Sequence, residues 1–357
     1  MDLAELGWNE SWQKHFDSLD DNNLVPARVA REDKESYLII GEHGESTGKV
    51  SGAFMHKTCS RADFPTVGDW VAAQFQSQED AAIIHEILPR KSKFSRKEPG
   101  SKTEEQVLAA NIDTAFLVSG LDGNFNVRRI ERYVALAWDS GIDPVIVLNK
   151  ADLCDELEAC ICEVEAIALG IPVFAMSAAR NQGVDVLRSY ITKGKTVAFL
   201  GSSGVGKSSI VNCLLGEDKQ KVNSISDAVG KGKHTTTRRE LIAFPDGGLM
   251  IDTPGMRELQ VWGEGDGMKK AFRDIEELAQ SCKFRDCKHD MEPGCAVKSA
   301  IENGTLSDER YRSYLKLQKE FQFLSQRGDY KARIAERKRG KEIAKIAREL
   351  QRRRGEG

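Results

Sequence analysis

The residues with the clearest capacity for chemistry form a glycine-rich loop, Gly201-Ser-Ser-Gly-Val-Gly-Lys-Ser208. An apolar strand at 196–200 precedes the loop, and an apolar helix begins at Lys207. Phosphate oxygens need several converging N–H donors, which a tight turn into a helix N-terminus supplies together with the helix dipole. The pattern predicts a nucleotide site in which Lys207 contacts the β- and γ-phosphates and the Ser208 hydroxyl binds magnesium; the alternative is a chance loop of this composition. The residues predicted to hold the phosphates are Gly201, Ser202, Ser203, Gly204, Val205, Gly206, Lys207, Ser208 and Ser209.

A second motif, Asn149-Lys-Ala-Asp152, follows the apolar run 144–148. Ligands of open α/β sheets bind at the carboxyl ends of the strands, so this motif is expected beside the phosphate loop, with Asn149 tying the two segments together. The Asp152 carboxylate can accept hydrogen bonds from guanine N1–H and N2–H, whereas adenine offers neither donor, and the motif therefore favours GTP. The alternative for this tetrapeptide is a simple turn cap. The predicted base-binding residues are Asn149, Lys150, Ala151 and Asp152, with Ser177 and Ala178 after the next strand, where the Ala178 N–H would donate to guanine O6.

A third phosphate element, Asp252-Thr-Pro-Gly255, follows the apolar run 248–251. Its carboxylate would hold magnesium through water while the Gly255 N–H meets the γ-phosphate, although an ordinary Asp-Pro-Gly turn is the alternative. Between the two phosphate elements lies the polar, glycine-flanked segment 230–239, which is suited to a mobile switch. Within it Thr236 is predicted to close on magnesium and the γ-phosphate. Magnesium is thus predicted to bind Ser208, Thr236 and Asp252.

Three cysteines and one histidine cluster near the C-terminus as Cys282-x4-Cys287-x-His289-x5-Cys295. Three thiolates and an imidazole are the ligand set of a closed tetrahedral zinc site, which leaves no position for a catalytic water. Pro293-Gly294 supplies a turn before the last ligand. We therefore expect one structural zinc ion per chain; the alternative is a group of thiols without metal.

The chain that must position these motifs has 357 residues, 40% hydrophobic and 30% charged, enough for two or three domains. Short strands at 29–31, 36–40, 48–54 and 68–75, with no helix between them, indicate a small OB-type barrel. The basic stretch 90–97 before Pro99-Gly100 is typical of a linker. From Ile112 onward, strands alternate with helices, which predicts a parallel sheet covered on both faces. A helix is expected at 184–191 and another at 268–280.

Charge is unevenly distributed along the chain. The net charge is only −3, but residues 331–354 contain eleven Lys and Arg against three Glu. Apolar residues interspersed there allow an amphipathic helix that contacts nucleic-acid phosphates, the alternative being a solvated tail without a specific partner. No apolar run approaches the roughly 18 residues of a membrane span, and the N-terminus does not resemble a secretory signal. We therefore expect a cytoplasmic protein with no membrane partner.

The order of the motifs is inverted, because the guanine motif precedes the phosphate loop, and this indicates a circularly permuted GTPase. Together with a preceding barrel and a following Cys/His cluster, that order resembles the RsgA (YjeQ/YloQ) family over essentially the whole chain. The resemblance implies an OB-fold domain at 1–98 that includes the linker, a permuted P-loop GTPase α/β domain at 99–275, and a helical zinc-binding domain with a basic tail at 276–357. It also implies a monomer that acts with the 30S ribosomal subunit and its 16S rRNA in late subunit maturation.

The catalytic group is not obvious from the sequence. Many GTPases carry a glutamine after the Asp-x-x-Gly glycine, but here that residue is Met256, whose thioether cannot orient water. The resemblance implies that His234, just before the switch threonines, takes this role; the alternative is an exposed loop histidine without one.

Three functions remain open at this point. The first is a GTPase that binds GTP and GDP with magnesium and is stimulated by the small ribosomal subunit. The second is an rRNA-binding module that nucleotide switches, with incidental hydrolysis. The third is a P-loop ATPase with accidental guanine motifs.

Overall fold

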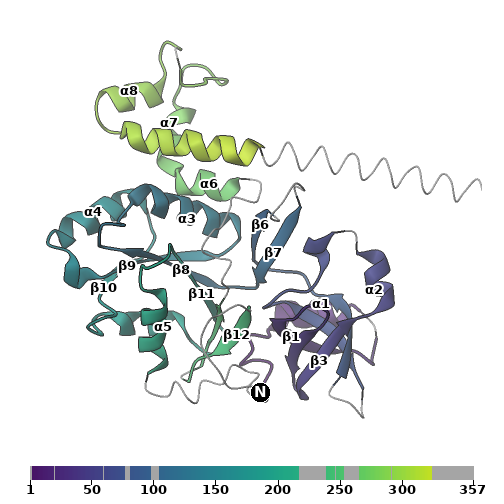
Figure 1. The fold of residues 1–357 in the computed structure, drawn as a ribbon. Coiled ribbons are helices and arrows are strands. Elements are labelled where there is room, and N and C mark those ends of the chain that lie inside the picture. Colours follow the sequence, from purple (N-terminus) through teal and green to yellow (C-terminus); the bar gives the residue numbers. More distant parts are fainter. Residues whose placement is uncertain are drawn as a thin grey trace, which may run out of the picture.

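Three regions follow one another along the chain, namely a barrel, an α/β sheet and a set of helices (Figure 1). The computed structural model describes residues 2–19, 21–58, 60–76, 81–97, 104–216, 239–245, 247–252, 265–290 and 292–323. Several sequence predictions lie outside these residues, namely those for His234, Thr236, Gly255, Pro99-Gly100 and the tail 331–357. No described helix combines the length and the apolar character that a bilayer crossing requires.

The N-terminal region is a closed five-stranded barrel, as predicted. Its strands are hydrogen-bonded in the order β1-β2-β3-β5-β4, and β4 pairs back onto β1. Small and β-branched side chains such as Val29, Ile39 and Ile84 fill the interior. The bounds are β1 Val25–Glu32, β2 Tyr37–Gly41, β3 Gly44–Val50, β4 Trp70–Phe75 and β5 Ala81–Ile87, with helices α1 Glu10–Asp17, α2 Gly52–Lys57 and η1 Arg61–Asp63.

Two local predictions in this region are wrong. The strand expected at 48–54 ends at Val50, because the Ser51 side chain accepts a hydrogen bond from the Phe54 N–H and caps helix α2. The expected linker contains strand β6 (Lys93–Lys97), which pairs with β7 (Glu105–Ala110). Its positive charges suggested exposure to solvent, but the Lys93 ammonium lies 2.7 Å from Glu105 and the Arg96 guanidinium donates to the Gln106 side chain, both on β7.

The central region is a sheet ordered β10-β9-β8-β11-β13-β12, parallel except for β12, which pairs antiparallel with β13. Alternate side chains of a strand face opposite sides: Leu117 belongs to the core beneath α3, while Phe116 belongs to the core beneath α5. Figure 1 shows α3 and α4 on one face and α5 on the other, so the doubly covered sheet is confirmed. The bounds are β8 Thr114–Gly120, β9 Asp143–Asn149, β10 Val173–Met176, β11 Thr196–Leu200, β12 Glu240–Ala243, β13 Leu249–Asp252, α3 Val127–Asp139, η2 Ala151–Leu153, α4 Leu157–Ile167, η3 Val184–Tyr190 and α5 Lys207–Leu215. The helix expected at 184–191 is therefore the 3-10 helix η3.

The barrel and the sheet share one hydrogen-bonded network, since β1 pairs with β12 at Arg31 and Glu240. A buried arginine strengthens this junction. The Arg28 guanidinium donates to the carbonyl oxygens of Leu6, Gly68 and Asn111, and thus joins the N-terminal segment, the barrel and the entry to β8. Burial lowers its pKa to about 10, so the group is still charged at neutral pH.

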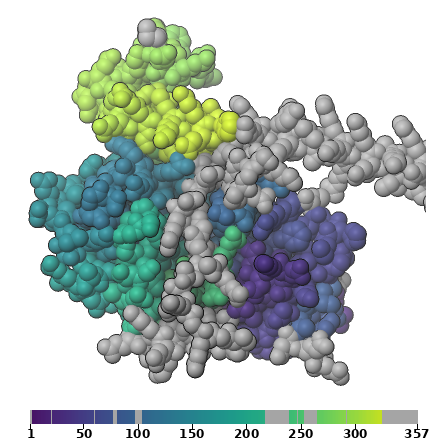
Figure 2. Space-filling view, in the orientation of Figure 1, coloured from purple at the N-terminus to yellow at the C-terminus, as the bar shows by residue number. Residues whose placement is uncertain are grey.

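The C-terminal helices lie against the central region (Figure 2), and α6 packs on α3. They are α6 Asp266–Ala271, α7 Arg273–Gln280, α8 Ala296–Glu302 and helical residues 308–323. The single helix expected at 268–280 is therefore divided in two at Phe272, whose side chain is fully buried. The Arg310 guanidinium lies 2.7 Å from both Glu131 of α3 and Asp274 of α7, and the Glu131 side chain is only 1% exposed.

Replacement of Arg310 tests how firmly these helices are attached. Arg310→Ala should lower the free energy of unfolding of the C-terminal region by about 3 kcal/mol, because Glu131 loses a buried partner. Arg312→Ala is the matched control. The Arg312 side chain is 76% exposed and that of its partner Asp308 is 50% exposed, so loss of this ion pair should cost less than about 1 kcal/mol. Urea unfolding of the full chain measures both, and equal losses for the two variants would contradict the expectation.

Candidate nucleotide and metal sites

The predicted nucleotide motifs meet at one edge of the central sheet. Parallel pairing places the ends of β9 and β10 side by side, since Met176 pairs with Asn149. On the other side of β8, strands β11 and β13 run parallel and in register. The ends of these strands and the loops after them carry the guanine motif, the Ser-Ala motif and the phosphate loop, and Asp252 is the last residue of β13. Segments far apart in the sequence therefore reach a common edge.

The phosphate loop has a conformation that its glycines permit. Gly201 and Gly206 have φ of 152° and 96°, and the loop leads directly into α5 at Lys207. A Cβ atom on Gly206 would lie 2.2 Å from the Asn149 amide nitrogen, and one on Gly201 would lie 2.3 Å from the Val118 carbonyl oxygen. Glycine is thus required by close approach as well as by backbone angle. The predicted phosphate contacts Ser203, Gly204, Ser208 and Ser209 are exposed on the loop and the first turn of α5.

Asn149 ties this loop to the guanine motifs, as predicted. Its side chain is 2% exposed; Nδ2 donates to the Val205 carbonyl oxygen at 2.9 Å, and Oδ1 accepts from the Ala178 N–H at 3.0 Å. One carboxamide therefore connects the loops after β9, β10 and β11. The Ala178 N–H, which the sequence assigned to guanine O6, has this protein partner in the structure.

Asp152 has the properties of a hydrogen-bond acceptor that is ready for a ligand. A hydrogen bond with Ser177 holds the pKa of Asp152 below its usual value, so the carboxylate is charged at neutral pH. Its side chain is 11% exposed, with Oδ2 lying 3.7 Å from the Arg180 guanidinium. Within the described part of the chain, buried Oδ1 has no hydrogen-bond partner. An acceptor of this kind suits the adjacent N–H donors of guanine.

Two residues that contact these motifs, Asp122 and Arg129, were not found from the sequence. Lys150 has a left-handed backbone (φ 67°) and its ammonium lies 2.6 Å from Asp122, which follows β8. Lys207 Nζ donates to the carbonyl oxygens of Gly201 and Ser202, and Arg129 of α3 donates to the Ser202 hydroxyl oxygen at 3.3 Å. The only sequence signal for Asp122 and Arg129 was their position just after a strand that ends at the same edge.

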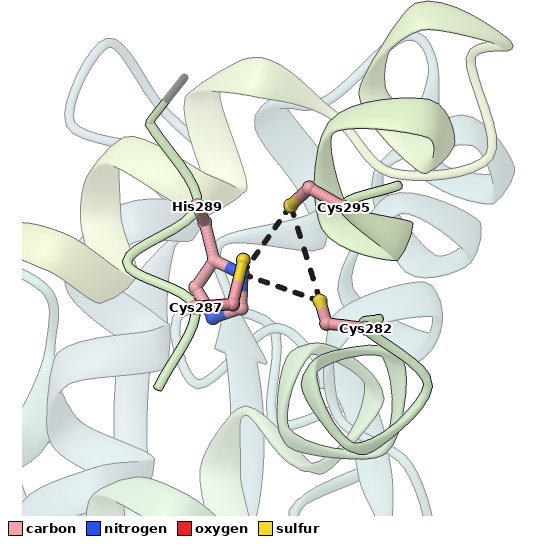
Figure 3. Close-up of side chains that lie close together, drawn as sticks. All are labelled: Cys282, Cys287, His289 and Cys295. Carbon is pink, nitrogen blue, oxygen red and sulfur yellow. Dashed lines mark hydrogen bonds between the residues drawn. The ribbon is translucent and has the colours of Figure 1, made fainter. Parts of the chain in front are cut away.

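The Cys/His cluster forms a compact set of metal ligands. Figure 3 shows Cys282, Cys287, His289 and Cys295 converging, and their ligand atoms all lie within 4.8 Å of one another. A tetrahedral zinc site would separate two sulfurs by about 3.8 Å, and a sulfur and a nitrogen by about 3.6 Å. The Cys282 and Cys295 sulfurs are 3.9 Å apart, and His289 Nδ1 is 3.5 Å from the first and 3.4 Å from the second. The four residues are thus consistent with zinc.

Helix α8 supports this cluster. Cys295 is its N-cap, and the Cys295 sulfur accepts a hydrogen bond from the Lys298 N–H. The N-terminal end of a helix stabilises a thiolate, which is the form that binds metal.

Comparison with known proteins agrees with this arrangement. The model of the RsgA GTPase family matches residues 87–262. A protein of Opitutus terrae named small ribosomal subunit biogenesis GTPase RsgA is 45% identical over 352 residues, which is 96% of each chain. The chain belongs to the RsgA GTPase family. An RsgA of Syntrophotalea carbinolica is 41% identical and matches over the full length of both chains.

Solved structures of RsgA-type proteins share the fold. The crystal structure of YjeQ from Thermotoga maritima matches with a TM-score of 0.63 and 28% identity, covering 84% of this chain and 98% of the other. YloQ, described as a circularly permuted GTPase, matches with a TM-score of 0.60 and 25% identity, covering 85% and 96%. The predicted family, GTPase class and circular permutation are therefore confirmed.

Gly206→Ala tests the contact between the phosphate loop and Asn149 in this RsgA-family protein. The added methyl group would collide with the Asn149 amide, so we expect the affinity for GTP to fall by more than about tenfold. Gly216→Ala is the control, because Gly216 also has a positive φ of 66° but has open space where the Cβ would lie. It should weaken the end of α5 and leave affinity unchanged. Titration with a fluorescent GTP analogue gives both values, and unchanged affinity of the Gly206 variant would refute the steric argument.

Proposed function

We propose that this protein hydrolyses GTP to GDP and phosphate during late maturation of the small ribosomal subunit, in the cytoplasm, and that binding to the 30S subunit accelerates the reaction. The observation that carries the proposal is the Asn149 carboxamide, which brings the phosphate loop and both guanine motifs to one sheet edge. The names of full-length relatives, small ribosomal subunit biogenesis GTPases, support the choice of partner.

Each predicted residue has a role in this proposal. Asp152 accepts from guanine N1–H and N2–H, while Lys150 lies along the base. The backbone N–H groups of the phosphate loop and the Lys207 ammonium hold the β- and γ-phosphates, and the Gly255 N–H meets the γ-phosphate. Ser208, Thr236 and Asp252 would hold magnesium, which neutralises phosphate charge when bound.

His234 is the group that we propose for orienting the attacking water. The residue after the Asp-x-x-Gly glycine is Met256, which has no polar atom for this purpose, and an imidazole near neutral pH can accept a proton. In the reaction a water oxygen bonds to the γ-phosphorus, the bond to the bridging oxygen breaks, and GDP leaves with the bonding electron pair.

The outer regions serve partner binding in this proposal. The barrel and the basic tail 331–357 contact 16S rRNA, and the chain acts as a monomer divided into domains at 1–98, 99–275 and 276–357. Phosphate contacts release counterions, so binding through the tail should weaken steeply with salt. A chain truncated after residue 330 tests the tail. If its affinity for 30S subunits and the salt dependence of that affinity are unchanged, the tail does not contact the subunit.

Turnover of GTP and ATP by the full chain, with and without purified 30S subunits, tests the function. We expect hydrolysis selective for GTP that the subunits strongly accelerate. Hydrolysis of ATP at an equal rate would indicate an ATPase, and GTP binding without acceleration would indicate an rRNA-binding module.

His234→Ala should lose most of the turnover and keep GTP affinity, because the imidazole acts on water and not on the nucleotide.

The Cys/His cluster is proposed to hold one structural zinc ion. Cys282→Ser should reduce bound zinc from one per chain to near zero and destabilise the C-terminal helices, because removing a ligand exposes the remaining thiolates. Cys162→Ser is the control, since Cys162 is an exposed thiol of α4 outside the cluster. Elemental analysis of purified protein measures the metal, and a full zinc content in the Cys282 variant would contradict the ligand set.

A further inference from the structure

The start of α3 carries three arginines that have different partners. Arg128 forms ion pairs with Glu131 and Glu309, and Arg132 lies 2.7 Å from Glu320, so both hold the C-terminal helices. Arg129 is directed to the phosphate loop instead. Its Nη1 donates to the Ser202 hydroxyl oxygen and to the Asn124 carbonyl oxygen, both at 3.3 Å. Within the described residues Arg129 forms no ion pair with a carboxylate.

Two cations therefore converge on one residue of the phosphate loop. Lys207 Nζ lies 2.7 Å from the Ser202 carbonyl oxygen, while Arg129 approaches the hydroxyl of the same residue. The lysine of such a loop reaches the β- and γ-phosphates. The Arg129 guanidinium contacts the same loop residue as this lysine.

The position of Arg129 within its helix supports a functional reading. It lies in the first turn of α3, where the helix dipole disfavours a cation, and no acidic residue of that turn compensates. A neutral donor would be sufficient to hold the Ser202 hydroxyl. A half-buried guanidinium at this point supplies charge and five fixed donors that match phosphate oxygens.

We propose that Arg129 is a catalytic residue that contacts the γ-phosphate of bound GTP and stabilises the negative charge that develops there during hydrolysis. The proposal rests on the GTPase function proposed above. The guanidinium stays protonated throughout and forms no covalent bond, so the bond changes are those of GTP hydrolysis alone. An arginine supplied from the same chain is a known means of accelerating phosphoryl transfer. Such a charge matters here because Met256 leaves the usual glutamine position without a polar group.

The experiment compares Arg129→Gln, Arg129→Lys and Arg132→Gln in the full chain. The glutamine can still donate to Ser202 but has no charge, whereas the lysine keeps the charge without the planar fork. Arg132→Gln is the matched control, because it removes the same charge from the same helix away from the loop. Measured quantities are kcat and KM for GTP without subunits, the affinity for GDP, and the affinity for GDP with aluminium fluoride, which mimics the transferring phosphoryl group.

We expect Arg129→Gln to lower kcat by about a hundredfold and to weaken the aluminium fluoride complex, while GDP affinity is unchanged. Arg129→Lys should recover part of the rate, and Arg132→Gln should match the wild type. Retained GDP affinity also shows that the variant is folded.

Three outcomes would overturn the inference. An unchanged kcat in Arg129→Gln would show that Arg129 only holds the phosphate loop in place. An equal loss of GDP and GTP affinity with kcat retained would assign it a purely structural role. A rate in Arg132→Gln as low as that of Arg129→Gln would attribute the effect to the general charge of α3. A wild-type chain that neither binds nor hydrolyses GTP would instead refute the proposed function itself.

Discussion

The nucleotide site depends on one buried carboxamide. Asn149 stands at the end of β9, and its two polar atoms satisfy a carbonyl of the phosphate loop and an N–H of the Ser-Ala loop. With only 2% of this residue exposed, water cannot replace either bond, so loss of the side chain would leave buried polar groups without partners. Gly206 has to lack a side chain for the same reason, because the Asn149 amide occupies the space that a Cβ would need. The strand order of the sheet places this carboxamide between the phosphate loop and the Ser-Ala loop.

Strand pairing and helix packing connect the nucleotide site to both outer regions of the chain. The strand that ends in Asp252, β13, pairs with phosphate-loop strand β11 on one side and with β12 on the other. Strand β12 pairs in turn with β1 of the barrel, and Arg28 reinforces that junction from within. On one face of the central sheet, α3 carries both Arg129, which contacts the phosphate loop, and Glu131, which contacts Arg310 of the C-terminal helices. Both outer regions are thus linked to the nucleotide site through strands of the sheet or through α3.

Local spacing was enough to recognise motifs in the sequence, whereas partners that come from distant segments were not found. The phosphate loop, the guanine motif and the Cys/His cluster could each be recognised because the residues of each motif lie close together in the sequence. The hairpin of β6 and β7 was missed because charged residues such as Lys93 look solvated until Glu105 pairs with them. The break at Phe272 was missed because only tertiary packing buries that ring and ends α6.

The sequence by itself determined the family, the GTPase class and the permutation, since motif order and ligand spacing are properties of a chain before it folds. Tertiary structure alone decided which side chains share the site. Arg129 and Arg132 are three residues apart and chemically identical, yet one contacts the phosphate loop and the other an acidic residue of the C-terminal helices. Side chains three residues apart lie on the same side of a helix, so the difference comes from the segments that pack beside each turn. Those segments are remote in sequence, and only the tertiary structure brings them there.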